Sequence, residues 1–372
     1  MCFPSTERGF DSRHSHKIAP IRIMKTHFSL LDAVRFFAAF WVMNFHYLFG
    51  QTGDLEWYRY GNLGVQLFFI ISGFVIVQSL NGKSIKEFAT NRFLRLFPLF
   101  WILCTSTYLI TIIIPHTSVL YFSEYLRSMT MLGDLFNGIV GYTRLIDPSY
   151  WTLTVELIFY IGIGIFTYYF SDKKIRYFLG GWLAISAIAF LFRVDHNFFV
   201  KLLLVAYASY FAFGGALALI ATKQARSIFE KYFDLALLFV SAIFSVYIHP
   251  RALEPYYVVN PLDEKIITIL LILFFIVVPI LVYLSPYVKN KKIIHFLAIL
   301  GGITYPLYLL HQRIGNAIMN FVIAHYDKIS WSNLSIGFEV VIIIVAYFVY
   351  LQDKKMRAWL KTKFFKDKKT TL

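Results

Sequence analysis

Long apolar stretches alternate with short polar connections along almost the whole chain. A helix needs about 20 mainly apolar residues to cross the hydrocarbon core of a bilayer. By that rule the pattern predicts ten membrane-spanning helices, at about residues 28–50, 62–80, 95–114, 150–170, 175–192, 199–221, 233–249, 266–285, 294–318 and 334–351. Segment 119–142 is amphipathic and interrupted by charges, so we expect it to lie at the membrane interface. The predicted fold class is an all-α polytopic membrane protein, a bundle of about ten transmembrane helices.

The amino-acid composition fits a chain that folds within a bilayer. Hydrophobic residues make up 58% of the sequence and charged residues only 15%, whereas soluble domains carry about 25% charged residues. The net charge of +15 could indicate nucleic-acid binding. The basic residues, however, lie in short blocks between apolar stretches rather than on one soluble face. We therefore interpret them as topology signals and expect no nucleic-acid partner.

Lysine and arginine are concentrated in alternate connections between the predicted helices. They occur in residues 81–94, 171–176, 222–232 and 286–293 and at both chain ends, while the other connections hold most of the acidic residues outside the helices. Cytoplasmic loops of membrane proteins carry an excess of Lys and Arg. We therefore expect an even number of spans and both termini in the cytoplasm.

The same pattern divides the chain into three parts. Residues 1–27 are expected to form a cytoplasmic N-terminal tail, 28–351 a transmembrane domain and 352–372 a basic cytoplasmic tail. Cys2 and Cys104 are the only cysteines. Neither a disulfide framework nor a thiolate metal site is therefore expected, and no metal ligands are assigned.

Ionisable residues inside predicted spans are candidates for function, because burying them in a bilayer is costly. Arg35 and His46 lie on the first span, eleven residues apart. That spacing is about three helical turns, so both side chains share one face, roughly 16 Å apart along the axis. Taken singly, a snorkelling arginine and an interfacial histidine remain alternatives. The shared stripe on an otherwise apolar helix is better explained by function.

Arg92 and Arg95 lie at the predicted cytoplasmic start of the third span. Side chains at i and i+3 project from the same side of a helix. Two guanidinium groups placed in this way suit a phosphate, which arginine binds in a bidentate manner. The alternative is that both residues anchor the helix at the cytoplasmic surface.

Glu156 and His311 are predicted to lie in the outer half of the membrane. Thr152, Glu156 and Tyr160 follow one another at i, i+4 spacing, and Tyr308 and His311 share a face at i, i+3. A buried carboxylate must pair with a histidine or arginine, or act as a neutral hydrogen-bond donor. A purely structural interhelical hydrogen bond for Glu156 and a packing role for His311 remain alternatives.

These candidates divide by side. Three arginines are expected near the cytoplasm, and His46, Glu156 and His311 near the outer face. This arrangement predicts a reaction in which a phosphate-bearing donor enters from the cytoplasm and an acceptor is modified near the outer face.

Five short sequence elements, in their order along the chain, resemble those of the acyltransferase-3 family of integral-membrane O-acyltransferases. Arg35 and His46 match its Arg-ten residues-His pattern, and Arg92 and Arg95 match its Arg-two residues-Arg pair. The other three elements are GNLGVQLFFIISGFVI at 61–76, PSYWTLTVELIFY around Glu156, and TYPLYLLH ending at His311. The resemblance covers about residues 28–350. The sequence departs from the family pattern at Phe36, Gln66, Thr152 and Thr154.

The resemblance implies a donor, an acceptor and residue roles. The donor would be acyl-coenzyme A, most often acetyl-coenzyme A, with no permanently bound cofactor. The acceptor would be a hydroxyl of a cell-envelope or surface polysaccharide or a lipid-linked glycan, in a multi-pass protein of the bacterial cytoplasmic (inner) membrane surrounded by its lipids. His46 would be the general base, Glu156 would orient or charge-stabilise it, and His311 would help to hold the acceptor or the developing oxyanion. The phosphates of coenzyme A would be bound by Arg35, Arg92 and Arg95. Substrate contacts are assigned to Trp151, Tyr305 and Tyr308.

Three other classes of protein could also place polar groups inside a membrane bundle or carry a histidine there. A transporter of an acidic solute or lipid-linked glycan would also need polar groups within the membrane, but it does not explain the five ordered elements. The other large family of membrane acyltransferases pairs a histidine with an asparagine or aspartate, an arrangement that is not evident here. A non-enzymatic assembly or sensor protein would tolerate substitution of His46 and Arg95. The oligomeric state is not predicted.

Overall fold

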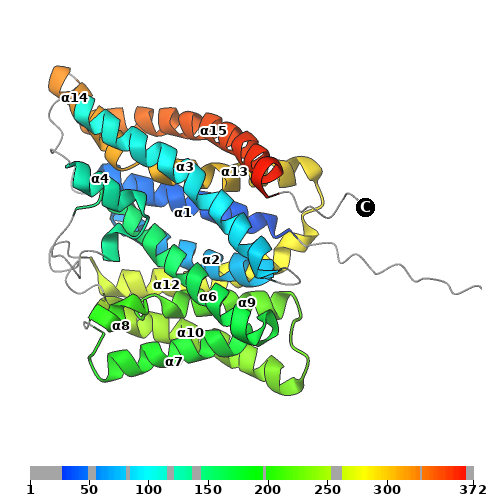
Figure 1. The fold of residues 1–372 in the computed structure, drawn as a ribbon. Helices are drawn as coiled ribbons and strands as arrows, with labels where there is room; N and C mark the ends of the chain where they lie inside the picture. The colour runs from blue at the N-terminus through cyan, green and yellow to red at the C-terminus, as the bar shows by residue number, and fades with distance from the viewer. Residues whose placement is uncertain are drawn as a thin grey trace, which may run out of the picture.

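The computed structural model describes residues 27–48, 56–80, 84–114, 121–135, 144–195, 198–252, 262–326 and 329–365. Within these ranges the chain is helical and contains no strand. The longer helices lie side by side as one bundle (Figure 1). In chain order the elements are α1 (Ser29–Leu48), η1 (Glu56–Leu63), α2 (Gly64–Leu80), α3 (Ile85–Ile113), α4 (Phe122–Met129), η2 (Pro148–Tyr150), α6 (Trp151–Phe170), η3 (Asp172–Lys174), α7 (Ile175–Leu191), α8 (Phe198–Leu202), α9 (Ala208–Ala221), α10 (Ile228–Ala252), α12 (Glu264–Leu284), η4 (Ser285–Tyr287), α13 (Lys291–Leu310), α14 (Arg313–His325) and α15 (Trp331–Phe364).

The predicted fold class is confirmed: the chain is an all-α polytopic membrane protein. Among the described residues, eight helices are long and apolar enough to cross a membrane, namely α2, α3, α6, α7, α10, α12, α13 and α15. The other two predicted spans correspond to α1 and α9. Helix α1 has 20 residues, which gives it a length of about 30 Å, that of the hydrocarbon core. Its polar residues, Arg35 and His46 among them, lower its hydropathy.

Helix α9 has 14 residues, and nearly all of them are buried. The predicted span 199–221 is thus divided into the short α8, a turn and α9. Helix α9 packs against α2, α7 and α10. A helix enclosed by other helices in this way need not match the thickness of the bilayer, because its ends are covered by protein.

Close contact between α2 and α9 depends on glycine. A Cβ atom added to Gly214 would collide with the backbone of Ile70 and Phe74, and one added to Gly73 would collide with the backbone of Phe211. Small residues let membrane helices approach closely, and packing then replaces the hydrophobic driving force that lipid does not supply. Helix α2 is in turn packed against α1, and α1 against α13. These contacts bring the helices that carry the candidate residues together.

Three boundaries differ from the prediction. Helix α3 begins at Ile85, ten residues before the predicted span, and the predicted span 294–318 is divided between α13 and α14. Helix α15 continues without interruption to Phe364, so part of the predicted C-terminal tail is helical. The predicted interfacial segment contains the short amphipathic helix α4. Of these differences, the early start of α3 matters most for the site, because it places Arg92 and Arg95 well inside the helix.

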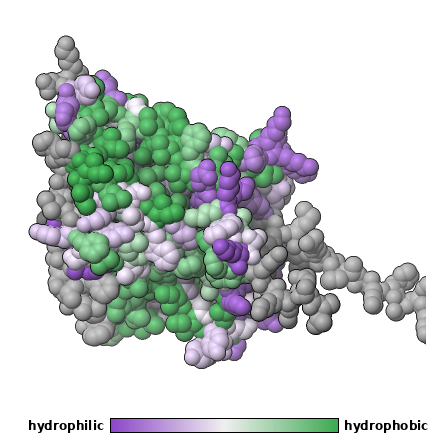
Figure 2. Space-filling view, turned by 45° about the horizontal axis from the view of Figure 1, so that its top comes forward, coloured by the Kyte–Doolittle hydropathy of each residue, from purple (hydrophilic) through white to green (hydrophobic). Residues whose placement is uncertain are grey.

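The surface shows how the bundle sits in a bilayer. Apolar side chains cover a broad central zone, and hydrophilic residues gather toward the end at which α15 finishes (Figure 2). The start of α1 and the end of α15 lie at the same end of the bundle (Figure 1). At that end Lys361 Nζ of α15 donates to Asn91 Oδ1 of α3 over 3.2 Å. Which side of the membrane this end faces stays a prediction from charge.

One of the basic residues counted as a topology signal has a second role. The side chain of Arg176 on α7 is only 2% exposed and pairs with Asp234 Oδ1 at 3.0 Å and Glu230 Oε2 at 2.5 Å, both on α10. An arginine buried in this way needs such partners, because an unpaired buried charge is strongly destabilising. The ion cluster therefore joins α7 to α10.

Candidate active site

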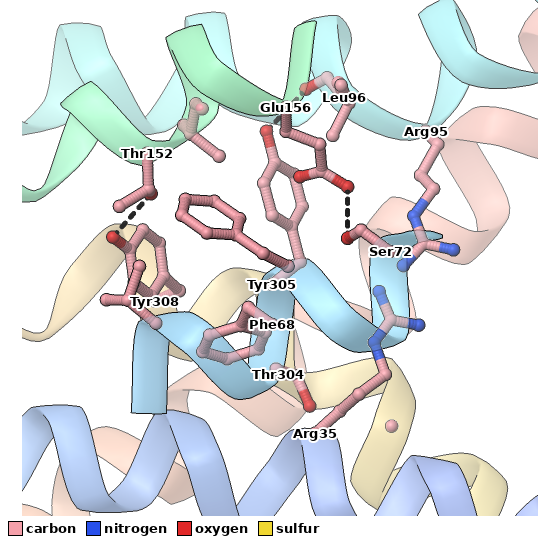
Figure 3. Close-up of a pocket in the computed structure, with 14 residues that line it drawn as sticks. Arg35, Phe68, Ser72, Arg95, Leu96, Thr152, Glu156, Thr304, Tyr305 and Tyr308 are labelled. Carbon is pink, nitrogen blue, oxygen red and sulfur yellow. Dashed lines mark hydrogen bonds between the residues drawn. The ribbon is translucent and has the colours of Figure 1, made fainter. Parts of the chain in front are cut away.

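A narrow cavity lies inside the bundle between α1, α2, α3, α6 and α13 (Figure 3). The space open to the centre of a water molecule is only about 50 Å³, so the cavity is tight. Its lining includes five of the predicted site residues, namely Arg35, Arg95, Glu156, Tyr305 and Tyr308. The sequence placed these residues on four different helices, and the fold brings them around one space.

Two guanidinium groups form one end of the cavity. Arg35 reaches it from α1 and Arg95 from α3, and their side chains face each other in Figure 3. Arg95 lies ten residues from the start of α3, which corresponds to a depth of about 15 Å along the helix. The buried Nε of Arg35 makes no hydrogen bond within the described part of the chain. Two such groups side by side repel each other and favour an anion between them.

Arg92 lies one helical turn from Arg95 and does not line the cavity itself. Its Nη2 donates to Ser79 Oγ at 3.0 Å, and its guanidinium carbon lies 5.6 Å from the ring centre of Tyr160. Its buried Nε and Nη1 have no hydrogen-bond partner among the described residues. Burial without a partner is costly for a charged group. Arg92 can therefore still bind an anion that enters beside the cavity.

Glu156 lies near the arginines rather than near the histidines. Its Oε1 accepts a hydrogen bond of 3.0 Å from Ser72 Oγ (Figure 3). It accepts a second one from the hydroxyl of Tyr160. The expected stripe of Thr152, Glu156 and Tyr160 does form on α6. The structure does not, however, bring Glu156 into hydrogen-bonding contact with His46. The sequence predicted the arginines on one side and His46, Glu156 and His311 together on the other, and the position of Glu156 differs from that prediction.

Tyrosine and threonine hydroxyls form the other end of the cavity. The hydroxyl of Tyr308 lies 2.7 Å from Thr152 Oγ1 and 2.8 Å from the carbonyl oxygen of Ser149. Tyr305, in the same wall, donates to the carbonyl oxygen of Leu96 at 2.9 Å. Trp151, also predicted to contact substrate, does not line the cavity and instead packs against Phe69 and Tyr207 (these three rings form an aromatic group beside it).

The two predicted histidines are neighbours. The ring centres of His46 on α1 and His311 at the end of α13 are 5.2 Å apart, and that of Tyr308 is 5.3 Å from that of His311. His311 is 1% exposed, while His46 is only partly buried. The histidine pair thus adjoins the tyrosine end of the cavity. Two imidazoles therefore lie next to one end of a cavity whose other end carries two guanidinium groups.

Sequence reasoning missed three residues that organise this site. Ser72 binds Glu156, Tyr47 donates to the carbonyl oxygen of His311 at 2.6 Å, and Asp147 is fully buried. In the sequence Asp147 belongs to one of the acidic connections that were interpreted as topology signals. Its position just before Pro148 and Ser149 is a signal for a helix cap, and its Oδ1 does accept from the backbone and hydroxyl of Ser149.

No cluster of three or more His, Cys, Asp or Glu side chains suited to a metal ion occurs in the described ranges. Cys104 is buried and unbonded to another cysteine. The chemistry available at the site is therefore that of imidazoles, a carboxylate, guanidinium groups and hydroxyls.

These features define a class: a multi-pass membrane protein with an internal cavity that has guanidinium groups at one end and tyrosines next to two histidines at the other. Comparison with known proteins then gives the family. Residues 28–351 match the acyltransferase domain that defines the acyltransferase-3 family, and the chain belongs to that family.

Two curated proteins are similar to the chain. "Putative acetyltransferase ORF330" of Acidianus two-tailed virus is 25% identical over 303 residues, which cover 80% of this chain and 86% of that protein. "Nodulation protein 10" of Rhizobium leguminosarum bv. viciae is 32% identical over 115 residues, 26% of this chain and 31% of that protein. No solved structure matches the chain. The family and these relatives agree with the interpretation from sequence motifs: the protein is a membrane acyltransferase.

Proposed function

We propose that the protein transfers an acyl group, most often acetyl, from cytoplasmic acyl-coenzyme A to a hydroxyl of a cell-envelope or surface glycan. The transfer would take place toward the outer side of the bacterial cytoplasmic membrane. The observation that carries this proposal is the cavity, which has Arg35 and Arg95 at one end and the Tyr308 hydroxyl, next to the histidine pair, at the other. A donor with phosphates at one end and a thioester at the other matches that polarity.

The arginine end suits the phosphates of coenzyme A. Arg35, Arg92 and Arg95 come from two helices, and Arg35 and Arg92 carry buried guanidinium nitrogens without partners among the described residues. Charge-assisted bonds from guanidinium to phosphate are roughly twice as strong as neutral hydrogen bonds. A phosphate that enters would therefore relieve both the mutual repulsion and the unmet hydrogen bonds. The narrow cavity suits the pantetheine arm, which is a thin chain.

Glu156 would guide that arm. Both described hydrogen bonds to its carboxylate end on Oε1, so Oε2 can accept the N–H of a pantetheine amide. This role replaces the one expected from sequence, in which Glu156 oriented His46. Tyr305 and Tyr308, which line the cavity, would contact the donor or acceptor along the same wall.

His46 would be the general base. It deprotonates the acceptor hydroxyl, whose oxygen then attacks the thioester carbonyl carbon. The C–O bond forms, the C–S bond breaks, and the coenzyme A thiolate leaves and takes up the proton from the imidazole. Histidine suits this role because it exchanges protons near neutral pH. A positioned acid–base group contributes about 10²–10⁴-fold to a rate.

The test uses purified full-length protein, radiolabelled acetyl-coenzyme A and envelope glycan from a host that lacks the protein. We expect label in the glycan, an acetyl-sized mass increase by mass spectrometry, and loss of at least about 100-fold in rate for His46→Ala. The matched control is His325→Ala, a change in an exposed histidine at the end of α14. Undiminished transfer by folded His46→Ala would refute the assigned base. Solute uptake into vesicles without acyl transfer would refute the function.

A further inference from the structure

His311 is held in a single tautomer by the backbone. Its Nδ1 lies 2.7 Å from the carbonyl oxygen of Tyr308. A carbonyl oxygen can only accept a hydrogen bond, so Nδ1 must carry the hydrogen. In a neutral imidazole the other nitrogen, Nε2, then carries the free lone pair.

The Nε2 atom of His311 is buried and does not contribute a hydrogen bond to the described fold. Its Nε2 is inaccessible to solvent and makes no hydrogen bond within the described part of the chain. Buried acceptors in proteins are nearly always satisfied, and an exception calls for an explanation. The neighbouring ring of His46 is tilted by 41° at a centroid distance of 5.2 Å. His46 is also the more accessible of the two rings.

We propose that His311 is the positioning partner of His46: its Nε2 accepts the N–H of His46, so that the opposite nitrogen of His46 faces the acceptor hydroxyl as the base. The inference rests on the proposed function and gives His311 a different role from the binding of acceptor or oxyanion. Hydrogen bonds between catalytic groups are often long before substrate binds and tighten in the complex.

Side chains from three elements fix the position of His311. Tyr47 of α1 donates to its carbonyl oxygen at 2.6 Å, and the hydroxyl of Tyr308 on α13 is tied to the η2 turn. Asp147, just before that turn, accepts from the backbone N–H of Arg313 at 2.8 Å, two residues after His311. The titratable groups around the imidazole are thus His46, Tyr47, Tyr308, Asp147 and Arg313. The backbone on both sides of His311 is thus held in place, and the bond from Nδ1 to the Tyr308 carbonyl oxygen fixes the ring on it, as a positioning residue requires.

A second histidine, His325, makes the same contact with a backbone carbonyl, so this contact alone does not identify a positioning residue. His325 Nδ1 lies 2.8 Å from the carbonyl oxygen of Phe321, but this pair is exposed at the end of α14. Its other nitrogen can bond to water. Among the histidines that the structure describes, only His311 combines the fixed tautomer with a buried, unused Nε2 beside another imidazole. His325 therefore provides a matched control.

In the proposed step the proton of the acceptor hydroxyl moves to the free nitrogen of His46, while the His46 N–H stays hydrogen-bonded to His311 Nε2. The resulting imidazolium is stabilised by that lone pair. The hydroxyl oxygen forms the new ester bond, and the proton passes to the departing thiolate of coenzyme A. No co-reactant beyond donor and acceptor is needed.

The test compares His311→Asn with His325→Asn in the acetyl-transfer assay. Asparagine keeps an N–H that can reach the Tyr308 carbonyl and lacks the counterpart of Nε2. We expect kcat to fall about 100-fold with the KM for acetyl-coenzyme A changed less than about 2-fold, and wild-type values for the control. Wild-type kcat in folded His311→Asn would overturn the proposal. A change of about 100-fold in KM with kcat unchanged would also overturn it.

A second measurement is independent of activity. Nitrogen-15 NMR of labelled histidine in the wild-type protein, assigned by comparison with His311→Asn, should show a hydrogen on Nδ1 and a free Nε2. An Nε2-protonated tautomer would overturn the proposal whatever the activity of the variant, and His311→Gln supplies the assignment if His311→Asn does not fold. Absence of acyl transfer by the wild-type protein would instead refute the proposed function and leave the tautomer result standing.

Discussion

Replacing Ser72 by alanine tests whether a fixed orientation of the Glu156 carboxylate is needed for binding of the donor. The change removes a 3.0 Å hydrogen bond between α2 and α6 and leaves the one from Tyr160. Hydrogen bonds between membrane helices average about 0.6 kcal/mol and reach about 1.7, while bonds to charged groups are worth about 1.5–3 kcal/mol. The two ranges overlap near 1.5 kcal/mol, or about tenfold. We expect kcat/KM for acetyl-coenzyme A to fall by about that factor.

The assay is acetyl transfer at limiting acetyl-coenzyme A, with thermal unfolding in detergent as a measure of folding. Ser245→Ala is the matched control, because Ser245 is also a buried serine but donates to Ser241 of its own helix, α10. The control should keep wild-type kcat/KM. Equal kcat/KM for Ser72→Ala and wild type would show that Oε1 of Glu156 needs no fixed orientation. It would also remove the argument that Oε2 receives the donor.

Two further changes test the fold. Gly214→Ala should lower the unfolding temperature, because the added methyl group meets the backbone of α2 and overpacking costs about 1–3 kcal/mol. Gly181→Ala is the control and should leave the unfolding temperature unchanged, because there is open space at its Cβ. Equal unfolding temperatures for the two variants would contradict the close contact between α2 and α9. The hydrogen bond from His27 to Asp32 raises the pKa of His27, so the pair stabilises the fold below the ordinary histidine pKa of about 6.5 and loses that effect as pH rises through the raised value. The unfolding temperatures of wild type and His27→Gln should therefore converge between about pH 6 and 8, and a difference independent of pH would contradict this.

Helix type and position followed from the sequence because hydropathy acts on each stretch separately. Even α1, with its polar residues, was found, and the spacing of Arg35 and His46 on it is that of an intact helix. Family motifs then gathered most of the residues around the cavity. Hydropathy cannot locate the start of a helix whose first turns carry polar residues that face the protein interior. Arg92 and Arg95 looked like the edge of a span, yet they lie inside α3.

The pairings within the site could not be predicted from one chain. The bond from Ser72 to Glu156 joins residues 84 positions apart, and that from Tyr47 to His311 joins residues 264 positions apart. Such contacts depend on which helices are neighbours, and local patterns carry no information about that. The burial of Asp147 has the same origin, because the α13–α14 turn that covers it comes much later in the chain.

The ion cluster between α7 and α10 also has a consequence for how the chain is made. Arg176 precedes its partner Asp234 by 58 residues, so ribosomes must synthesise all of α7, α8 and α9 before the acid emerges. Until then Arg176 lacks the two carboxylates that pair with it in the folded protein, and its charge favours contact with water or lipid headgroups. The cluster can close only after α10 has been inserted. It therefore marks an intermediate step of membrane assembly, at which α7 and α10 become joined before α12, α13 and α15 are made.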